Sequence, residues 1–168
     1  MSKEIREIIT KAVIGKGRLK NKTTYPLNSV ANASSILGCW IVNHHYEAHL
    51  QQGKLYVKGS FDLNIWYSLD NEQKSQVYVE SISYQDELRI ITKEKVSFDG
   101  DITLIATCLQ APVCLEAKLN DNGLIEVTVE KTLHVDIVGE TKISIEVSDQ
   151  VEDWDEIDME INPTFLEK

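Results

Sequence analysis

The sequence lacks the motifs of most enzymes and of membrane-spanning proteins. It has no Gly-x-Ser-x-Gly nucleophile elbow, no Gly-x-x-x-x-Gly-Lys-Ser/Thr phosphate loop and no Cys-x-x-Cys pair. No run approaches the ~18 consecutive apolar residues of a membrane span, and residues 1–6 have no apolar signal core. We therefore expect a protein that is not an enzyme, uses no cofactor, does not span a membrane and is made and kept in a cytoplasm.

Basic residues are scarce and unevenly placed. The chain has 17 Lys and Arg against 27 Asp and Glu, for a net charge of −10. Residues 1–22 nevertheless carry +5 and residues 146–168 carry −8. Nucleic acid requires an extended basic face, so we expect no nucleic-acid partner. A chain with one basic and one acidic end can instead attract its own copies or other charged proteins.

Residues 148–168 combine acidic side chains with apolar anchors. Crowded like charges oppose packing into a core, whereas regularly placed apolar residues can dock onto a partner. We predict an acidic interaction tail here, and the residues expected to contact partner proteins are Asp153, Trp154, Asp155, Glu156, Ile157, Phe165 and Leu166.

The basic N-terminal segment has the apolar spacing of one helical face. That spacing is carried by Ile5, Ile8, Ile9, Ala12 and Val13. It predicts a short amphipathic helix within residues 1–22, followed by a polar loop over residues 16–35. A β-strand is the alternative, because so many of these residues are β-branched.

Residues 23–147 are dominated by period-2 patterns separated by turn signals. Apolar and polar residues alternate over 61–67, 77–84, 102–106, 125–130 and 143–147. Short strands at such intervals predict an all-β body, an antiparallel sandwich or barrel. A β body with exposed edges can add strands from neighbouring copies, so residues 23–147 are the candidate self-assembly body. We expect Trp40, Trp66 and Tyr67 to belong to the core; the alternative is that they stack a sugar in a carbohydrate-binding or other ligand-binding sandwich.

A weak internal repeat relates residues 39–68 to residues 108–138. Both copies contain Glu-Ala-x-Leu, then a glycine turn at Gly53 or Gly123, and then strands in which the apolar residues have the same spacing. Such a repeat predicts two duplicated β units that pack as a pseudo-symmetric pair.

The best candidate for a metal site is the histidine cluster at residues 44–49. On a helix, His45 and His49 would share a face as i, i+4 ligands. On a strand they would lie about 13 Å apart at ~3.3 Å per residue, too far to share one ion. The order also misses both zinc-protease arrangements, HExxH and HxxEH. We therefore expect no metal, with His45 and His49 as weak candidates only.

Taken together, several longer motifs resemble one family. They are residues 6–13 (REIITKAV), 16–18 (KGR), 34–44 (SSILGxWIxNH), 62–68 (DxNxWYS), 109–116 (LQxPxCLE), 138–142 (VGETK) and 160–166 (EINPxFL). The set resembles the outer spore coat morphogenetic protein E (CotE) family of endospore-forming Bacillales, and the resemblance runs from residue 4 to the end.

The resemblance implies a non-enzymatic scaffold of the spore coat. Proteins of this family are made in the mother-cell cytoplasm during sporulation and self-assemble into a layer around the forespore. They are recruited by the basal-layer morphogenetic ATPase and in turn recruit outer-coat proteins. The expected partners are therefore copies of the chain, that ATPase and outer-coat clients.

The resemblance also adds a second interpretation of the cysteines. Without it, Cys39, Cys108 and Cys114 are expected to be reduced, mostly buried thiols. In a coat exposed to an oxidising exterior, a cysteine could cross-link subunits. Cys114 is the residue within a matching motif, so it is the candidate for that cross-link.

Overall fold

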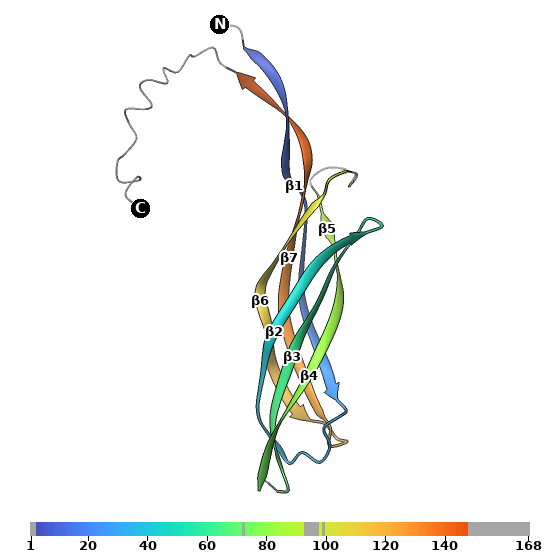
Figure 1. Ribbon diagram of the computed structural model, residues 1–168, viewed down its shortest axis with the longest axis vertical. Coiled ribbons are helices and arrows are strands. Elements are labelled where there is room, and N and C mark those ends of the chain that lie inside the picture. The colour runs from blue at the N-terminus through green and yellow to red at the C-terminus, as the bar shows by residue number, and fades with distance from the viewer. Residues whose placement is uncertain (1–2, 72, 93–97, 99, 148–168) are drawn as a thin grey trace, which may run out of the picture. The chain divides into compact units, whose positions relative to one another are not determined.

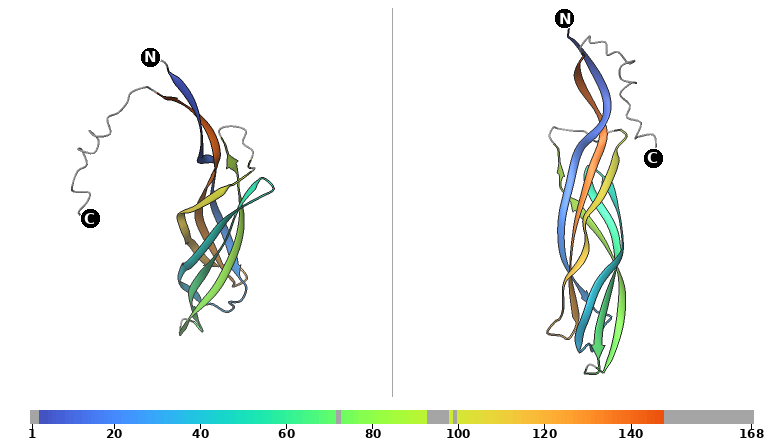
Figure 2. Two further views of the ribbon diagram at one scale, coloured as in Figure 1. Left: turned by 45° about the horizontal axis from the view of Figure 1, so that its top comes forward. Right: turned by 90° about the vertical axis from the view of Figure 1, so that its left-hand side faces the viewer.

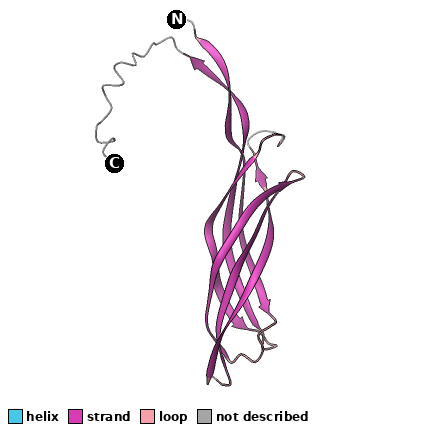
Figure 3. Cartoon of the chain, in the orientation of Figure 1, coloured by secondary structure: helices cyan, strands magenta, loops and turns pink. Residues whose placement is uncertain are grey.

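The structure is a computed structural model that describes residues 3–71, 73–92, 98 and 100–147. The described part is all-β (Figure 3). Its strands are β1 (Glu4–Leu27), β2 (Ser35–Gln51), β3 (Lys54–Leu69), β4 (Lys74–Leu88), β5 (Ile90–Ile91), β6 (Thr103–Leu119) and β7 (Ile125–Val147).

The strands form two sheets. One has the order β5-β1-β7-β6 and the other β2-β3-β4 (Figure 1). The β1–β5, β2–β3, β3–β4 and β6–β7 pairs are antiparallel. The predicted antiparallel sandwich is confirmed, and the two sheets form two layers (Figure 2).

The core lies between the sheets and comes mainly from their central strands, β3 and β7. One apolar cluster includes Phe61, Leu63 and Ile65 of β3 with Ile125, Val127 and Val129 of β7, among other residues. The other includes Leu55 and Val57 with Leu133, Val135 and Ile137. Each such side chain stabilises the fold by roughly 1.5–3 kcal/mol through burial.

The predicted N-terminal helix is wrong, because residues 4–27 form strand β1. The β-branched side chains suit a strand, and pairing with β7 satisfies the backbone of this segment. Gly15 and Gly17 do not end an element but allow close packing. A Cβ on Gly17 would lie 2.6 Å from Cδ2 of Leu55 and 3.1 Å from Cβ of Leu88. The predicted loop over residues 16–35 is accordingly strand as far as Leu27.

The chain divides into two compact units. One is Lys11–Glu140; the other combines Met1–Thr10 with Thr141–Lys168. In the second unit the described residues are Lys3, the first part of β1 and the last part of β7. Lys3 Nζ lies 3.0 Å from Glu146 Oε1. The predicted division at residues 22 and 147 stays a prediction.

The two predicted repeats correspond to two hairpins, β2–β3 and β6–β7. Their turns share a glycine with positive φ, +75° at Gly53 and +76° at Gly123. The apolar positions that align after each glycine, such as Leu55 with Ile125, are buried in both. Duplication of the unit stays a prediction.

Candidate functional site

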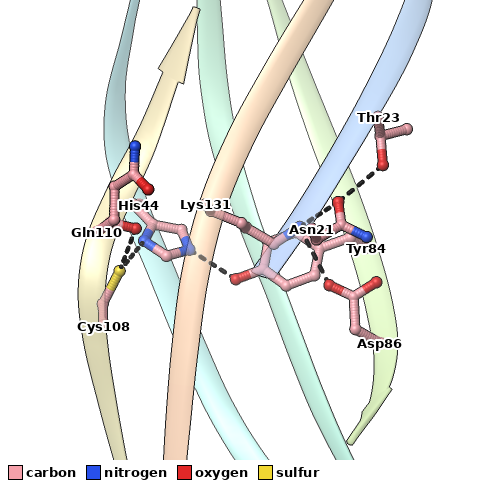
Figure 4. A network of polar contacts seen from close by, with 8 residues as sticks. All are labelled: Asn21, Thr23, His44, Tyr84, Asp86, Cys108, Gln110 and Lys131. Carbon is pink, nitrogen blue, oxygen red and sulfur yellow. Dashed lines mark hydrogen bonds and ion pairs between the residues drawn. The ribbon is translucent and has the colours of Figure 1, made fainter. Parts of the chain in front are cut away.

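Figure 4 shows a polar cluster formed by side chains from several strands of the sandwich. Along β7 it lies between the two apolar clusters. Its members are Asn21 on β1, Asp86 on β4 and Lys131 on β7. Each occupies an inward position of its strand: Lys131 stands between the buried Val129 and Leu133. Lys131 is 2% exposed, so the sandwich holds a charged side chain where its strand pattern calls for an apolar one.

The Lys131 amine has three partners. Nζ lies 3.0 Å from Asp86 Oδ2, donates to Asn21 Oδ1 at 3.3 Å and sits 3.9 Å from the centre of the Tyr84 ring. Asp86 Oδ2 is buried and accepts no hydrogen bond from the described residues, so its compensation is the ion pair with Lys131. A buried charge needs such partners, because removal from water costs several kcal/mol per ion.

A second part of the cluster depends on an irregularity in β2. The β2–β3 register shifts between Val42 and His45, and Asn43 has a φ of +57°. This bulge turns His44 inward. The His44 ring then lies 2.6 Å from the Tyr84 hydroxyl through Nε2 and 3.9 Å from Cys108 Sγ through Nδ1.

Burial sets the protonation of this second part. Burial lowers the pKa of His44, and the charges of Lys131 and His45 lower it further. Burial also raises the pKa of Tyr84, helped by Asp86, and burial raises the pKa of Cys108. The Cys108 thiol donates a hydrogen bond to the Gln110 carbonyl at 3.1 Å. The imidazole, phenol and thiol are therefore all neutral at pH 7, and Cys108 is not an activated nucleophile.

The structure places His45 and His49 on strand β2, in register with Ser60 and Tyr56 of β3. His49 Nε2 lies 3.6 Å from Glu47 Oε2, and both histidines line an open surface hollow with Lys58. Among the described residues, no group of three or more His, Cys, Asp or Glu side chains is arranged to hold a metal ion.

Two of the cysteines lie next to each other across the edge strands β2 and β6. Burial raises the pKa of the Cys39 thiol, and a side-chain contact with Cys114 raises it further. All three cysteines are free thiols and partly buried. The predicted cross-linking residue, Cys114, thus faces a thiol of its own chain.

The outer face of the β2–β3–β4 sheet carries an apolar patch. We call Trp40, Trp66, Val77 and Val79 the outer patch; these side chains are 43%, 42%, 47% and 52% exposed. Register places Trp66 beside Val77. The expectation that Trp40 and Trp66 belong to the core is wrong, because the strand alternation turns Cys39, Ile65 and Tyr67 inward and the indoles outward. Tyr67 is in the core, as expected.

The predicted client-binding residues Asp153, Trp154, Asp155, Glu156, Ile157, Phe165 and Leu166 lie outside the described residues.

Comparison with known proteins places the chain in a family. The family model described as outer spore coat protein E (CotE) matches residues 4–166. The chain belongs to this family. Comparison with curated proteins gave no match, and comparison with solved structures gave none either.

The CotE match confirms the resemblance found in the sequence. Members of this structural family are spore coat proteins, so this chain is a spore coat protein located in the coat. The described residues also contain no helix that is long and apolar enough to cross a membrane.

Sequence reasoning missed the polar cluster around Lys131. The signal was present: Lys131 interrupts an otherwise apolar inward series from Ile125 to Ile137. Asp86 likewise stands between the inward-facing Tyr84 and Leu88. A charged residue on the core side of a strand needs an ionic or hydrogen-bonding partner, but the alternation of apolar and polar residues does not identify that partner.

Proposed function

We propose that the protein is a non-enzymatic morphogenetic scaffold, which self-assembles around the forespore and recruits outer-coat proteins. It is made in the mother-cell cytoplasm and then becomes part of the coat. Membership of the CotE family supports a structural role in the coat. The proposed partners are further copies of the chain, the basal-layer morphogenetic ATPase and outer-coat clients.

The observation that carries the assembly part of the proposal is the outer patch. Contiguous apolar side chains on a sheet surface are typical of protein interaction sites, and aromatic residues are enriched there. Asn64, in register between Trp40 and Val79, is only 9% exposed, so its neighbours already cover a polar side chain on this face. A second copy of the chain would remove these indoles and valines from water.

Size-exclusion chromatography with light scattering tests this proposal on the full chain. We expect oligomers that grow with protein concentration, and we expect Trp40→Ser and Trp66→Ser to weaken them. Lys58→Ser is the matched control, since Lys58 is an exposed, outward-facing residue of β3 away from the indoles. A wild type that is monomeric at every concentration would overturn self-assembly as a property of the chain alone.

A second candidate is a ligand-binding sandwich that takes a carbohydrate on the same face. Its support is the placement of the two indoles around Gly38: a Cβ added there would meet Trp66 Cε3 at 3.7 Å and Trp40 Cζ3 at 3.8 Å. Exposed aromatic rings can stack on flat apolar ligand faces. Saturable sugar binding that Trp66→Ala removes, in a protein that stays monomeric, would favour this candidate over the scaffold.

A further inference from the structure

The Lys131 amine lies between a carboxamide and a carboxylate in the interior of the sandwich (Figure 4). Nζ is 3.3 Å from Oδ1 of Asn21 and 3.0 Å from Oδ2 of Asp86. An amine, a carboxamide and a proton carrier are the groups required to join two side chains by an amide bond. We propose that Lys131 and Asn21 form an intramolecular isopeptide bond, with Asp86 as the proton carrier.

The Asn21 carboxamide is held as the electrophile. Its Oδ1 accepts hydrogen bonds from two donors, Lys131 Nζ at 3.3 Å and Thr23 Oγ1 at 2.7 Å. Because both partners donate, the oxygen rather than the NH₂ group faces them. The Thr23 hydroxyl is therefore placed where negative charge develops when an amine attacks the carbonyl carbon. Asp86, as a carboxylate, is a poor electrophile and a good proton acceptor.

The surroundings favour the reaction in two ways. Lys131 is 2% exposed and covered by the Tyr84 ring, which packs 6.2 Å from Phe61 between ring centres. Low polarity disfavours separated charges, so a proton can pass from the ammonium to the carboxylate to leave a neutral pair. The fold also holds amine and amide in contact, which makes the step intramolecular; reactive geometries have the atoms about 3–3.5 Å apart.

The step balances without an oxidant or a co-reactant. One proton moves from the Lys131 ammonium to Asp86, and the freed lone pair of Nζ attacks Cγ of Asn21. The carbonyl electron pair moves to Oδ1, beside the Thr23 hydroxyl. Asp86 then protonates Nδ2 and takes a proton from Nζ. The carbonyl re-forms, the bond from Cγ to Nδ2 breaks, and ammonia leaves with that electron pair.

The product ties together strands β1 and β7, which are neighbours in one sheet. The joined positions are 110 residues apart in sequence. Closing so long a loop covalently restricts the unfolded chain, the same effect by which disulfides stabilise proteins. This inference concerns the single subunit and does not depend on assembly, so it stands or falls separately from the proposed scaffold role.

Intact mass spectrometry of the purified, denatured full-length protein tests the bond. The expected mass is lower than the sequence mass by one ammonia, once the initiator methionine is accounted for. Trypsin should then yield residues 119–142 uncut at Lys131 and carrying the dipeptide Asn21-Lys22, because cleavage after Lys20 and Lys22 leaves that dipeptide attached.

Variants supply a sharper control. In Asn21→Asp the proton released by Lys131 can reside on the new carboxyl group, whose protonated form is electrophilic, unlike a carboxylate. This variant should lose one water instead of one ammonia and reach the same final mass as the wild type, since both give the same bond. Lys131→Arg should keep its full sequence mass. If either variant does not fold, the mass and the peptide map of the wild type still show whether the bond is present.

Two results would overturn the proposal. One is a folded wild type, shown by circular dichroism, that keeps its full sequence mass after long incubation. The other is an ammonia loss that maps to a succinimide at Asn122-Gly123, in a peptide that trypsin cuts at Lys131 and that carries no dipeptide.

Discussion

Lys131 and Asp86 are joined across the two sheets, with Nζ 3.0 Å from Oδ2 and side chains only 2% and 16% exposed. β7 and β4 belong to different sheets, so this pair is a polar link through the core. Because the pair lies between the two apolar clusters, removal of either side chain leaves the other as a buried charge without its ionic partner.

Asp86→Ala should be strongly destabilising, because without its proton carrier Lys131 stays an unbonded ammonium that is buried without an ionic partner. Loss of one partner of such a pair costs about 3–5 kcal/mol in the free energy of unfolding. Asp86→Ala combined with Lys131→Met should cost less than Asp86→Ala alone, since the orphaned charge is gone. Urea denaturation of the three proteins measures the difference. An unchanged unfolding free energy in Asp86→Ala would show that the pair does not form.

Stability should fall as the pH is lowered below about 6.5, and His44 should contribute to that fall. Burial lowers the pKa of His44 in the folded protein, so the unfolded chain takes up a proton first as the pH falls. Between the two pKa values the unfolded state binds more protons, and the free energy of unfolding therefore decreases with decreasing pH. The measurement is a set of urea denaturations from about pH 7.5 to pH 5.

His44→Gln should flatten this pH dependence, because it removes the partly buried imidazole. If the free energy of unfolding changes with pH by the same amount in the wild type and in His44→Gln, His44 does not contribute to the pH dependence.

How far the fold follows from the sequence can be seen by comparing β7 with β1. In β7 the alternation of Ile125, Val127 and Val129 with charged or polar neighbours predicts a strand, and the strand is there. In β1 the inward series includes Gly15, Gly17 and Asn21, which provide little apolar signal. Local pattern therefore favoured a helix and then a loop, whereas pairing with β7 and packing under Leu55 decide the structure.

The candidate site was less accessible from sequence for the same reason. His44 reaches the interior only because of the bulge at Asn43, and the partners of Lys131 come from strands distant in sequence. The family motifs point to the spore coat, but no motif marks Asn21, Asp86 or Lys131 as a group.

Oxidation should join Cys39 to Cys114 within one chain, because their side chains already touch. Non-reducing electrophoresis after treatment with diamide, followed by peptide mapping, distinguishes the products. A monomer with this internal disulfide is expected, and Cys108→Ser should not alter it. A disulfide-linked dimer that Cys114→Ser removes would instead support the cross-link between subunits proposed from the family resemblance.

Truncation after Ser148 should leave folding and oligomerisation intact and abolish recruitment of outer-coat clients. Within the full chain, Trp154→Ser or Phe165→Ser should weaken client binding more than Glu156→Gln, because a single solvated charge contributes only about 0–1 kcal/mol. Pull-down of coat proteins with each variant provides the comparison. A truncated chain that fails to fold would show that residues 149–168 belong to the body.

The central claim is that the chain builds the coat by assembling with itself through the outer patch. Light scattering of the full-length protein over a range of concentrations tests it most directly, with Trp66→Ser and Lys58→Ser measured alongside. The account predicts oligomers for the wild type and Lys58→Ser, and a marked loss of oligomers for Trp66→Ser. A wild type that stays monomeric throughout, or oligomers that Trp40→Ser and Trp66→Ser leave unchanged, would contradict it.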